Sequence, residues 1–208
     1  MTRSPRRAAP ARPLRRPLLG IVLGGLLLAG AATGQERIAA VLERRLAANP
    51  RDAEALEQLG VERLRRGDHA RALIQLHKAI AVSPRRGTAY FYLGLVYYER
   101  GLLFREIEAY QKSILHLPDF MPARLNLAHA YLAAGRVPDA IEQYRWVERQ
   151  DPGNLTVLHN LGILFADLNR SQDARTYLER YLSLAPAGAP GRVRAAEILA
   201  RATEESDR

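Results

Sequence analysis

The sequence contains no cysteine among its 208 residues. This absence excludes disulfide bonds, thiolate metal sites, a cysteine nucleophile and a lipid-modified cysteine near the N-terminus. β-Branched residues are also sparse, whereas alanine, leucine, arginine and glutamate dominate the composition. Such a composition favours helix over strand.

Short motifs of the common enzyme classes are missing as well. The sequence holds no HExxH pair, no Walker-type phosphate loop and no GxSxG nucleophile turn. His129 and His159 come without a cysteine or a clear carboxylate partner that would complete a metal site. We therefore expect a protein that is not an enzyme and that uses no cofactor and no metal.

The formal net charge of +9 is concentrated at the N-terminus. Residues 1–34 contain six arginines and no acidic residue, which leaves 25 basic and 22 acidic residues in the remainder of the chain. This mild excess is typical of a solvated surface, and no basic stripe interleaved with aromatic residues accompanies it. We therefore expect no nucleic-acid binding.

The N-terminal segment has the composition of a targeting signal. Residues 1–17 are basic and rich in proline, and residues 18–32 are apolar without a single charge. A basic region, a short apolar region and small residues at its end indicate a secretory signal peptide. The apolar run is shorter than the ~20 residues that cross a membrane as a helix, yet an uncleaved inner-membrane anchor is the alternative. Residues 1–34 are thus predicted to be a signal peptide or an N-terminal membrane anchor, and the rest periplasmic or exported.

Prolines recur at every 34th position along most of the chain, an interval that we call the repeat length. They are Pro50, Pro84, Pro118, Pro152 and Pro186. Proline lacks a backbone N–H and disfavours helical geometry in the preceding residue, so each is expected to end a helix. A second series, in which glycine and asparagine favour a left-handed turn between two helices, consists of Gly67, Gly101, Gly135 and Asn169.

Further positions repeat with the same period. Leucine occupies residues 59, 93, 127 and 161, and a small residue follows it at Gly60, Gly94, Ala128 and Gly162. A second small series comprises Ala72, Ala140 and Ala174, with Glu106 as the exception in the second unit. Large residues recur at Arg63, Tyr97, Tyr131 and Phe165, and at Leu76, Tyr110, Tyr144 and Leu178. Small residues let two helices cross closely, and large ones pack between them.

These series resemble the tetratricopeptide repeat. The resemblance implies an all-α fold, a right-handed superhelical solenoid of helix–turn–helix units that cover one another's apolar faces. Four units are predicted, at residues 53–86, 87–120, 121–154 and 155–188. Residues 35–52 are expected to form an N-terminal capping half-repeat that contains the second helix of a partial unit. Residues 189–208 are expected to form a C-terminal capping helix and tail.

In this family the first helix of each unit lines a concave groove, and the resemblance places ten residues there as peptide-binding candidates. One polar column comprises Gln58, Tyr92, Asn126 and Asn160, and beside it lie Phe91, Leu95, Leu125, His129, His159 and Ile163. Asparagine both donates and accepts hydrogen bonds, so the column could pair with an extended peptide backbone. The alternative is that the asparagines bond within their own repeat or to water, and that some apolar members pack between neighbouring first helices.

The sequence therefore predicts a protein–protein interaction scaffold that binds a peptide or protein segment in its groove, in the bacterial envelope. Recognition of apolar or aromatic side chains is expected, because the groove positions carry no lysine or arginine. The alternative is a structural, self-associating subunit of an envelope assembly for pili, secretion or cytochrome maturation. A homo-oligomer is possible under either interpretation.

Overall fold

The structure is a computed structural model that describes residues 32–206. All regular secondary structure in this range is α-helical. The helices are α1 (Ala32–Ala48), α2 (Ala53–Arg65), α3 (His69–Val82), α4 (Gly87–Glu99), α5 (Leu103–His116), α6 (Met121–Ala133), α7 (Val137–Gln150), α8 (Leu155–Asp167), α9 (Ser171–Leu184) and α10 (Arg192–Ser206). The predicted all-α class is confirmed.

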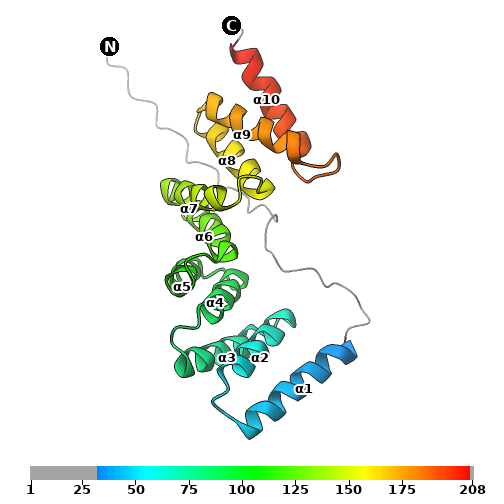
Figure 1. Ribbon diagram of the computed structural model, residues 1–208, viewed down its shortest axis with the longest axis vertical. Coiled ribbons are helices and arrows are strands. Elements are labelled where there is room, and N and C mark those ends of the chain that lie inside the picture. The colour runs from blue at the N-terminus through cyan, green and yellow to red at the C-terminus, as the bar shows by residue number, and fades with distance from the viewer. Residues whose placement is uncertain (1–31, 207–208) are drawn as a thin grey trace, which may run out of the picture.

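The helices form an elongated stack, with α1 at the base and α10 at the top (Figure 1). Each of the four predicted repeat ranges contains one pair, from α2 with α3 to α8 with α9. The two helices of a pair pack on each other, and the second helix of each pair packs on the first helix of the next. In the middle of the stack, α5 and α7 lie to the left of α4 and α6 (Figure 1). The arrangement is a helical-repeat solenoid, as the sequence predicted.

The turn within each pair adopts the left-handed conformation that the sequence predicted. The φ angles are 73° at Gly67, 67° at Gly101, 73° at Gly135 and 56° at Asn169. Asn169 is the only non-glycine residue with a positive φ among those that the structure describes. Asparagine tolerates this region better than other side chains do, because its short amide bonds locally. All four pairs can therefore turn in the same way.

Helix starts are secured by local chemistry. The side chains of Asp52, Asp68 and Asn154 accept hydrogen bonds from backbone N–H groups in the first turns of α2, α3 and α8, at 2.9, 3.1 and 3.2 Å. Each bond satisfies a donor that the helix itself leaves unpaired. α6 and α7 instead have a proline in their first turn, where the missing N–H needs no partner.

In three of the four pairs, the two helices cross closely at a glycine. A Cβ atom built on Gly94 would lie 2.3 Å from Cε1 of the buried Tyr110 ring, and one on Gly162 would lie 2.4 Å from Cδ2 of Leu178. Gly60 meets Leu76 in the same way. Glu106 is only 3% exposed, and α5 begins and ends at the same repeat positions as the other second helices. The long side chain at this position therefore leaves the frame of the second unit unshifted.

The predicted targeting segment lies mostly outside the described residues. Residues 1–31 are not described, and residues 32–34 of the predicted segment form the first turn of α1. None of the helices within residues 32–206 combines the length and the apolar character that crossing a membrane requires.

Substitution of Gly94 by alanine tests the close crossing. We expect Gly94→Ala to lower the free energy of unfolding by about 1–3 kcal/mol, because the rigid, buried ring of Tyr110 cannot move aside cheaply. This loss should outweigh the gain in helix propensity that alanine brings. Gly153→Ala is the matched control, since its nearest neighbouring atom would lie 3.7 Å away. Urea unfolding followed by circular dichroism measures both variants, and equal stability would contradict the close crossing.

Candidate peptide-binding face

The ten candidate residues all lie on first helices. Gln58 belongs to α2, and the others are distributed over α4, α6 and α8. Their accessibility differs widely. Gln58 is exposed, five are half-buried (Tyr92, His129, His159, Asn160 and Ile163), and four are buried (Phe91, Leu95, Leu125 and Asn126). We call this surface of the first helices the candidate face.

Three of the buried candidates are part of the hydrophobic core. Phe91, Leu95 and Leu125 belong to the main cluster of buried apolar residues. The Phe91 ring lies 5.1 Å from that of Phe120 and 5.9 Å from that of Tyr110, centroid to centroid. These side chains lie beneath the candidate face as part of the core. This agrees with the alternative that some apolar candidates pack between helices instead of binding a partner.

Asn126 corrects the prediction of an accessible amide ladder. Its side chain is only 7% exposed, and Nδ2 donates to the hydroxyl of Tyr110 at 3.4 Å. Tyr110 is almost fully buried on α5. A buried phenol needs a hydrogen-bond partner, and the asparagine of the next unit supplies it. Asn126 is therefore a structural residue that ties α6 to α5.

Asn160 repeats this arrangement one unit later. Its Nδ2 donates to the hydroxyl of Tyr144 at 3.2 Å and to Nε2 of His129 at 3.0 Å. Both tyrosine–asparagine pairs span 16 residues in the sequence. At the equivalent position of α3, Leu76 replaces the tyrosine and Tyr92 replaces the following asparagine. The two asparagines thus occur where a buried tyrosine precedes them, and this spacing was the sequence signal for the bond.

The hydrogen bonds of Asn160 define the tautomers of two histidines. An amide nitrogen can only donate, so Nε2 of neutral His129 accepts and its proton lies on Nδ1. Nδ1 of His159 lies 3.4 Å from the amide oxygen of Asn160, which can only accept. His159 therefore donates through Nδ1, and its Nε2 carries no proton. That Nε2 atom is buried without a hydrogen-bond partner among the described residues, close against Gly191.

Burial holds the network in its uncharged form. Burial lowers the pKa of His129. Burial also lowers the pKa of His159, although the hydrogen bond that His159 donates to Asn160 opposes this shift, and the charge of Arg194 lowers the pKa further. Burial raises the pKa of the Tyr144 phenol. A charged form in this apolar setting would lose hydration. No group of three or more metal-ligating side chains occurs within the described part of the chain.

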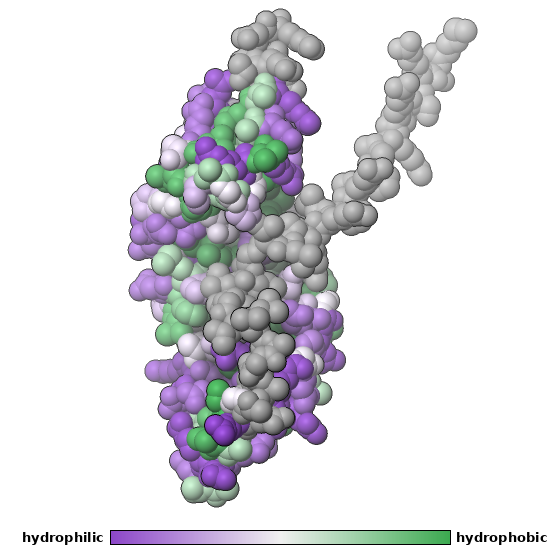
Figure 2. Space-filling model, turned by 90° about the vertical axis from the view of Figure 1, so that its right-hand side faces the viewer, coloured by the Kyte–Doolittle hydropathy of each residue, from purple (hydrophilic) through white to green (hydrophobic). Residues whose placement is uncertain are grey.

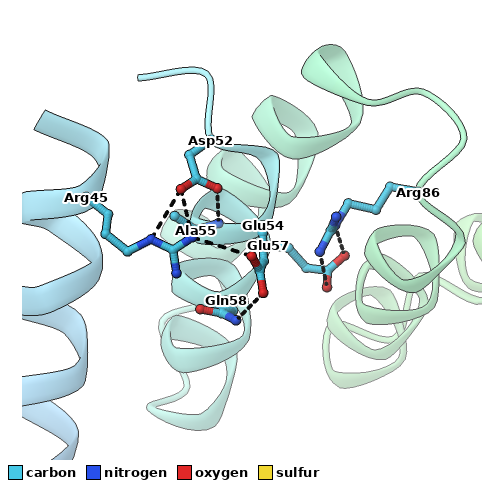
Figure 3. Close-up of polar contacts among 7 residues, drawn as sticks. All are labelled: Arg45, Asp52, Glu54, Ala55, Glu57, Gln58 and Arg86. Carbon is cyan, nitrogen blue, oxygen red and sulfur yellow. Dashed lines mark hydrogen bonds and ion pairs between the residues drawn. The ribbon is translucent and has the colours of Figure 1, made fainter. Parts of the chain in front are cut away.

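The N-terminal end of the face is polar and internally paired (Figure 3). Arg45 of α1 contacts Asp52 at 2.8 Å and Glu54 at 3.4 Å, and Gln58 donates to Glu54 at 3.1 Å. Beside them, Glu57 is buried and accepts from Arg86 at 2.7 Å and from Thr88 at 2.6 Å. These bonds join α1 to α2 and the first unit to the second.

The face carries no charge over the three following units. All candidate residues on α4, α6 and α8 are apolar, aromatic, amide or imidazole side chains. In the view from the right-hand side of Figure 1, apolar patches lie among hydrophilic ones on the coloured part of the surface (Figure 2). The candidate positions on α4, α6 and α8 themselves offer apolar contact with a few hydrogen-bonding groups, and no fixed charge for an ionic partner.

Stacked helix pairs with an extended face are the architecture of helical-repeat scaffold proteins. The family model of the tetratricopeptide repeat matches residues 57–120 and 125–189. The chain belongs to the tetratricopeptide repeat family, whose fold supports a protein–protein interaction scaffold.

Several solved structures share the fold. MamA, known from a crystal structure, is 21% identical to this chain in sequence. The match covers 76% of this chain and 95% of the MamA chain, with a TM-score of 0.67. YrrB, described as a TPR protein with an unusual peptide-binding site, is 18% identical and covers 84% and 86%, with a TM-score of 0.65. TTC0263, a TPR protein of Thermus thermophilus, is 23% identical and covers 82% and 93%, with a TM-score of 0.58. No curated protein resembles the sequence closely enough to count as a relative.

A double-mutant cycle tests the structural role of Asn126. We expect Asn126→Ala and Tyr110→Phe to show a coupling free energy of about 0.5–1.5 kcal/mol, because each removes the same buried hydrogen bond. Urea unfolding of the two single variants, the double variant and the unaltered chain provides the cycle. Additive effects would show that the two side chains do not stabilise each other.

The two histidines should make stability depend on pH. Their pKa values are lowered in the folded protein, so the unfolded chain binds more protons at pH values below about 6.5, the ordinary histidine pKa. Stability is then complete above that pH and falls as the pH decreases through it. We expect His129→Gln to reduce this loss between pH 7 and 5. His69→Gln, outside the network, is the control, and identical pH profiles for both variants would contradict the assignment.

Proposed function

We propose that the chain is a non-enzymatic scaffold that captures an extended or helical segment of a partner protein on the candidate face. The observation that carries the proposal is the uncharged surface across α4, α6 and α8. Tyr92, His129, Asn160 and Ile163 reach it while remaining half-buried. Partly accessible aromatic and aliphatic side chains on a rigid support suit the apolar side chains of a bound segment.

The hydrogen bonds within the face narrow the mode of capture. The Nδ2 groups of Asn126 and Asn160 already donate to buried tyrosines, so pairing of both with a peptide backbone is not part of the proposal. Capture rests on apolar contact with Tyr92, His129 and Ile163. No lysine or arginine stands at these positions, and a charged peptide terminus is therefore not required.

We place this activity in the bacterial envelope. The support is the sequence of residues 1–34, whose basic region, apolar region and small residues are typical of an export signal or a membrane anchor. The peptide-binding description of YrrB supports capture of a protein segment by this fold, at the level of the fold alone.

Photocrosslinking in cells tests the position of the captured segment. A photoreactive residue at Tyr92 is expected to capture a discrete partner, which mass spectrometry identifies. The matched control is the same residue at Phe104, an aromatic side chain that is 84% exposed on the second helix α5. The same partner captured equally from both positions would contradict binding on the candidate face.

A charge placed on the face should release the partner. We expect Ile163→Arg to reduce capture from Tyr92 roughly tenfold, because the arginine would have to be desolvated against apolar groups of the segment. Ile74→Arg, an equivalent change at an exposed isoleucine of α3, should leave capture unchanged. Circular dichroism verifies that both variants keep their helices, and undiminished capture by Ile163→Arg would overturn the proposal.

A further inference from the structure

Helix α1 is the second helix of an incomplete unit. It packs on α2 in the way that α3 packs on α4. Leu42 stands one repeat length before Leu76, and Pro50 stands one repeat length before Pro84. Both leucines are buried. The first helix that would complete this unit is not among the residues that the structure describes.

Helix α10 is the first helix of another incomplete unit. It contacts both α9 and α8, just as α4 contacts both α3 and α2. Ala196 follows Gly162 by one repeat length, and Leu199 follows Phe165 by the same interval. Small and large residues thus recur in α10 at the positions where first helices carry them. Within the described range 32–206, α10 is packed by the preceding unit alone, and no second helix of its own unit follows it.

Positions that are buried in complete units are exposed in these two half-units. Ile38 occupies the repeat position that holds Ala72, Glu106, Ala140 and Ala174 in the four complete units. Those four residues are at most 3% exposed, whereas Ile38 is 49% exposed. Val41 is 55% exposed on the same side of α1. In the other series, Gly60, Gly94, Ala128 and Gly162 are buried, whereas Ala196 is exposed. Each half-unit therefore exposes the surface that its missing helix would cover.

Both surfaces are hollowed. A depression of about 290 Å³ on α1 and α2 is lined by Arg37, Ile38, Val41, Leu42, Arg45 and Gln58. A second, of about 440 Å³, is lined by Ala187, Gly188, Ala189, Arg192, Val193 and Ala196. We call them the α1 slot and the α10 slot. The α1 slot lacks a first helix, and the α10 slot lacks a second helix.

The two slots are complementary in helix type. Helices of one unit run antiparallel, so pairing α10 with α1 brings the C-terminal end of α10 to the N-terminal end of α1. The dipoles of antiparallel helices place ends of opposite partial charge together.

We propose that the α10 slot of one chain receives α1 of a second copy, so that the two half-units form one complete unit across the interface. Ala196 then lies against Ile38, as Gly60 lies against Ala72 and Leu76 within the first unit. Leu199 meets Val41, as Phe165 meets Tyr177, with 5.5 Å between ring centroids. The contact is head-to-tail, and repetition extends the solenoid.

A second copy fits the α1 slot better than the chain's own residues 19–31 do. Gly25 lies one repeat length before Leu59, where the units have leucine, and Leu26 lies one repeat length before Gly60, where the units have a small residue. The segment therefore reverses the repeat pattern. In α10 the small position is Ala196 and the later large position is Leu199, whereas that later position is Ala29 in residues 19–31. The leucine position of α10 is Ala195, which is buried against α8 and α9. The unit tolerates a long side chain opposite the small residue, since Glu106 occupies the position of Ile38 in the second unit.

Disulfide trapping tests this interface, because the chain has no cysteine of its own. Full-length Ile38→Cys and Ala196→Cys chains, distinguished by tags, are mixed and oxidised. The proposed pairing should bring the two Cβ atoms to about 4 Å, within disulfide reach, and yield a heterodimer. Ile74→Cys mixed with Ala196→Cys is the matched control. A heterodimer yield no greater than in the control would overturn the proposal. The same low yield is expected if residues 1–31 fill the α1 slot.

Two further outcomes distinguish this head-to-tail interface from a symmetric contact and from the candidate face. Homodimers of Ile38→Cys that form as readily as the heterodimer would reveal a symmetric α1–α1 contact and overturn the proposal. Adding Val41→Glu to the Ile38→Cys chain should lower the heterodimer yield roughly tenfold, since the charge would be buried against Leu199. Val41→Glu alone should leave partner capture from Tyr92 intact, so failure of the interface is distinguishable from failure of the candidate face.

Discussion

The close crossing of two helices within each unit is the constraint on which the rest of the structure depends. A small residue on the first helix, such as Gly94 or Gly162, lets a large residue of the second helix lie directly on its backbone. One helix pair still leaves apolar surface on both flanks, so the next pair must cover it. Repetition of this contact builds the elongated stack, in whose middle α4 and α6 lie on the same side (Figure 1).

Large residues at the crossing have a consequence for the candidate face. Where the second helix contributes a tyrosine, its hydroxyl is buried beneath the face and needs a partner. Asn126 and Asn160 provide that partner from the following unit. The amides therefore serve cohesion between units, and the asparagine next to His129 and His159 also holds both imidazoles in defined tautomers. The surface left for a partner is apolar and aromatic, supported by a hydrogen-bonded layer.

The ends of the stack obey the same constraint as its middle. α1 and α10 each cover a neighbouring unit with one side and expose the other, which in a complete unit would be buried. The exposed Ile38 and Val41 on α1, and Ala196 on α10, lie at repeat positions whose equivalents contact the other helix of their unit. In complete units the equivalent side of a second helix is covered by a first helix, and the equivalent side of a first helix by a second helix.

Much of the fold could be predicted from the sequence, because its determinants are local and periodic. The prolines, the left-handed turn residues and the small residues recur once in every repeat length, and each acts through its own backbone or its neighbours. The candidate face was predicted only in part. Its helices are those expected, yet the sequence left open whether Asn126 and Asn160 point to a ligand or to the protein itself.

The sequence by itself determined the helices, their turns and the order in which they pair. Only the tertiary structure decided which side chains of the first helices remain accessible. That property depends on contacts between consecutive units, where the hydroxyls of Tyr110 and Tyr144 meet the asparagines of the following unit. The exposed fraction of a side chain depends on all of its neighbours, including those in the adjacent units. It therefore cannot be deduced from one repeat position and is set only when the units are stacked.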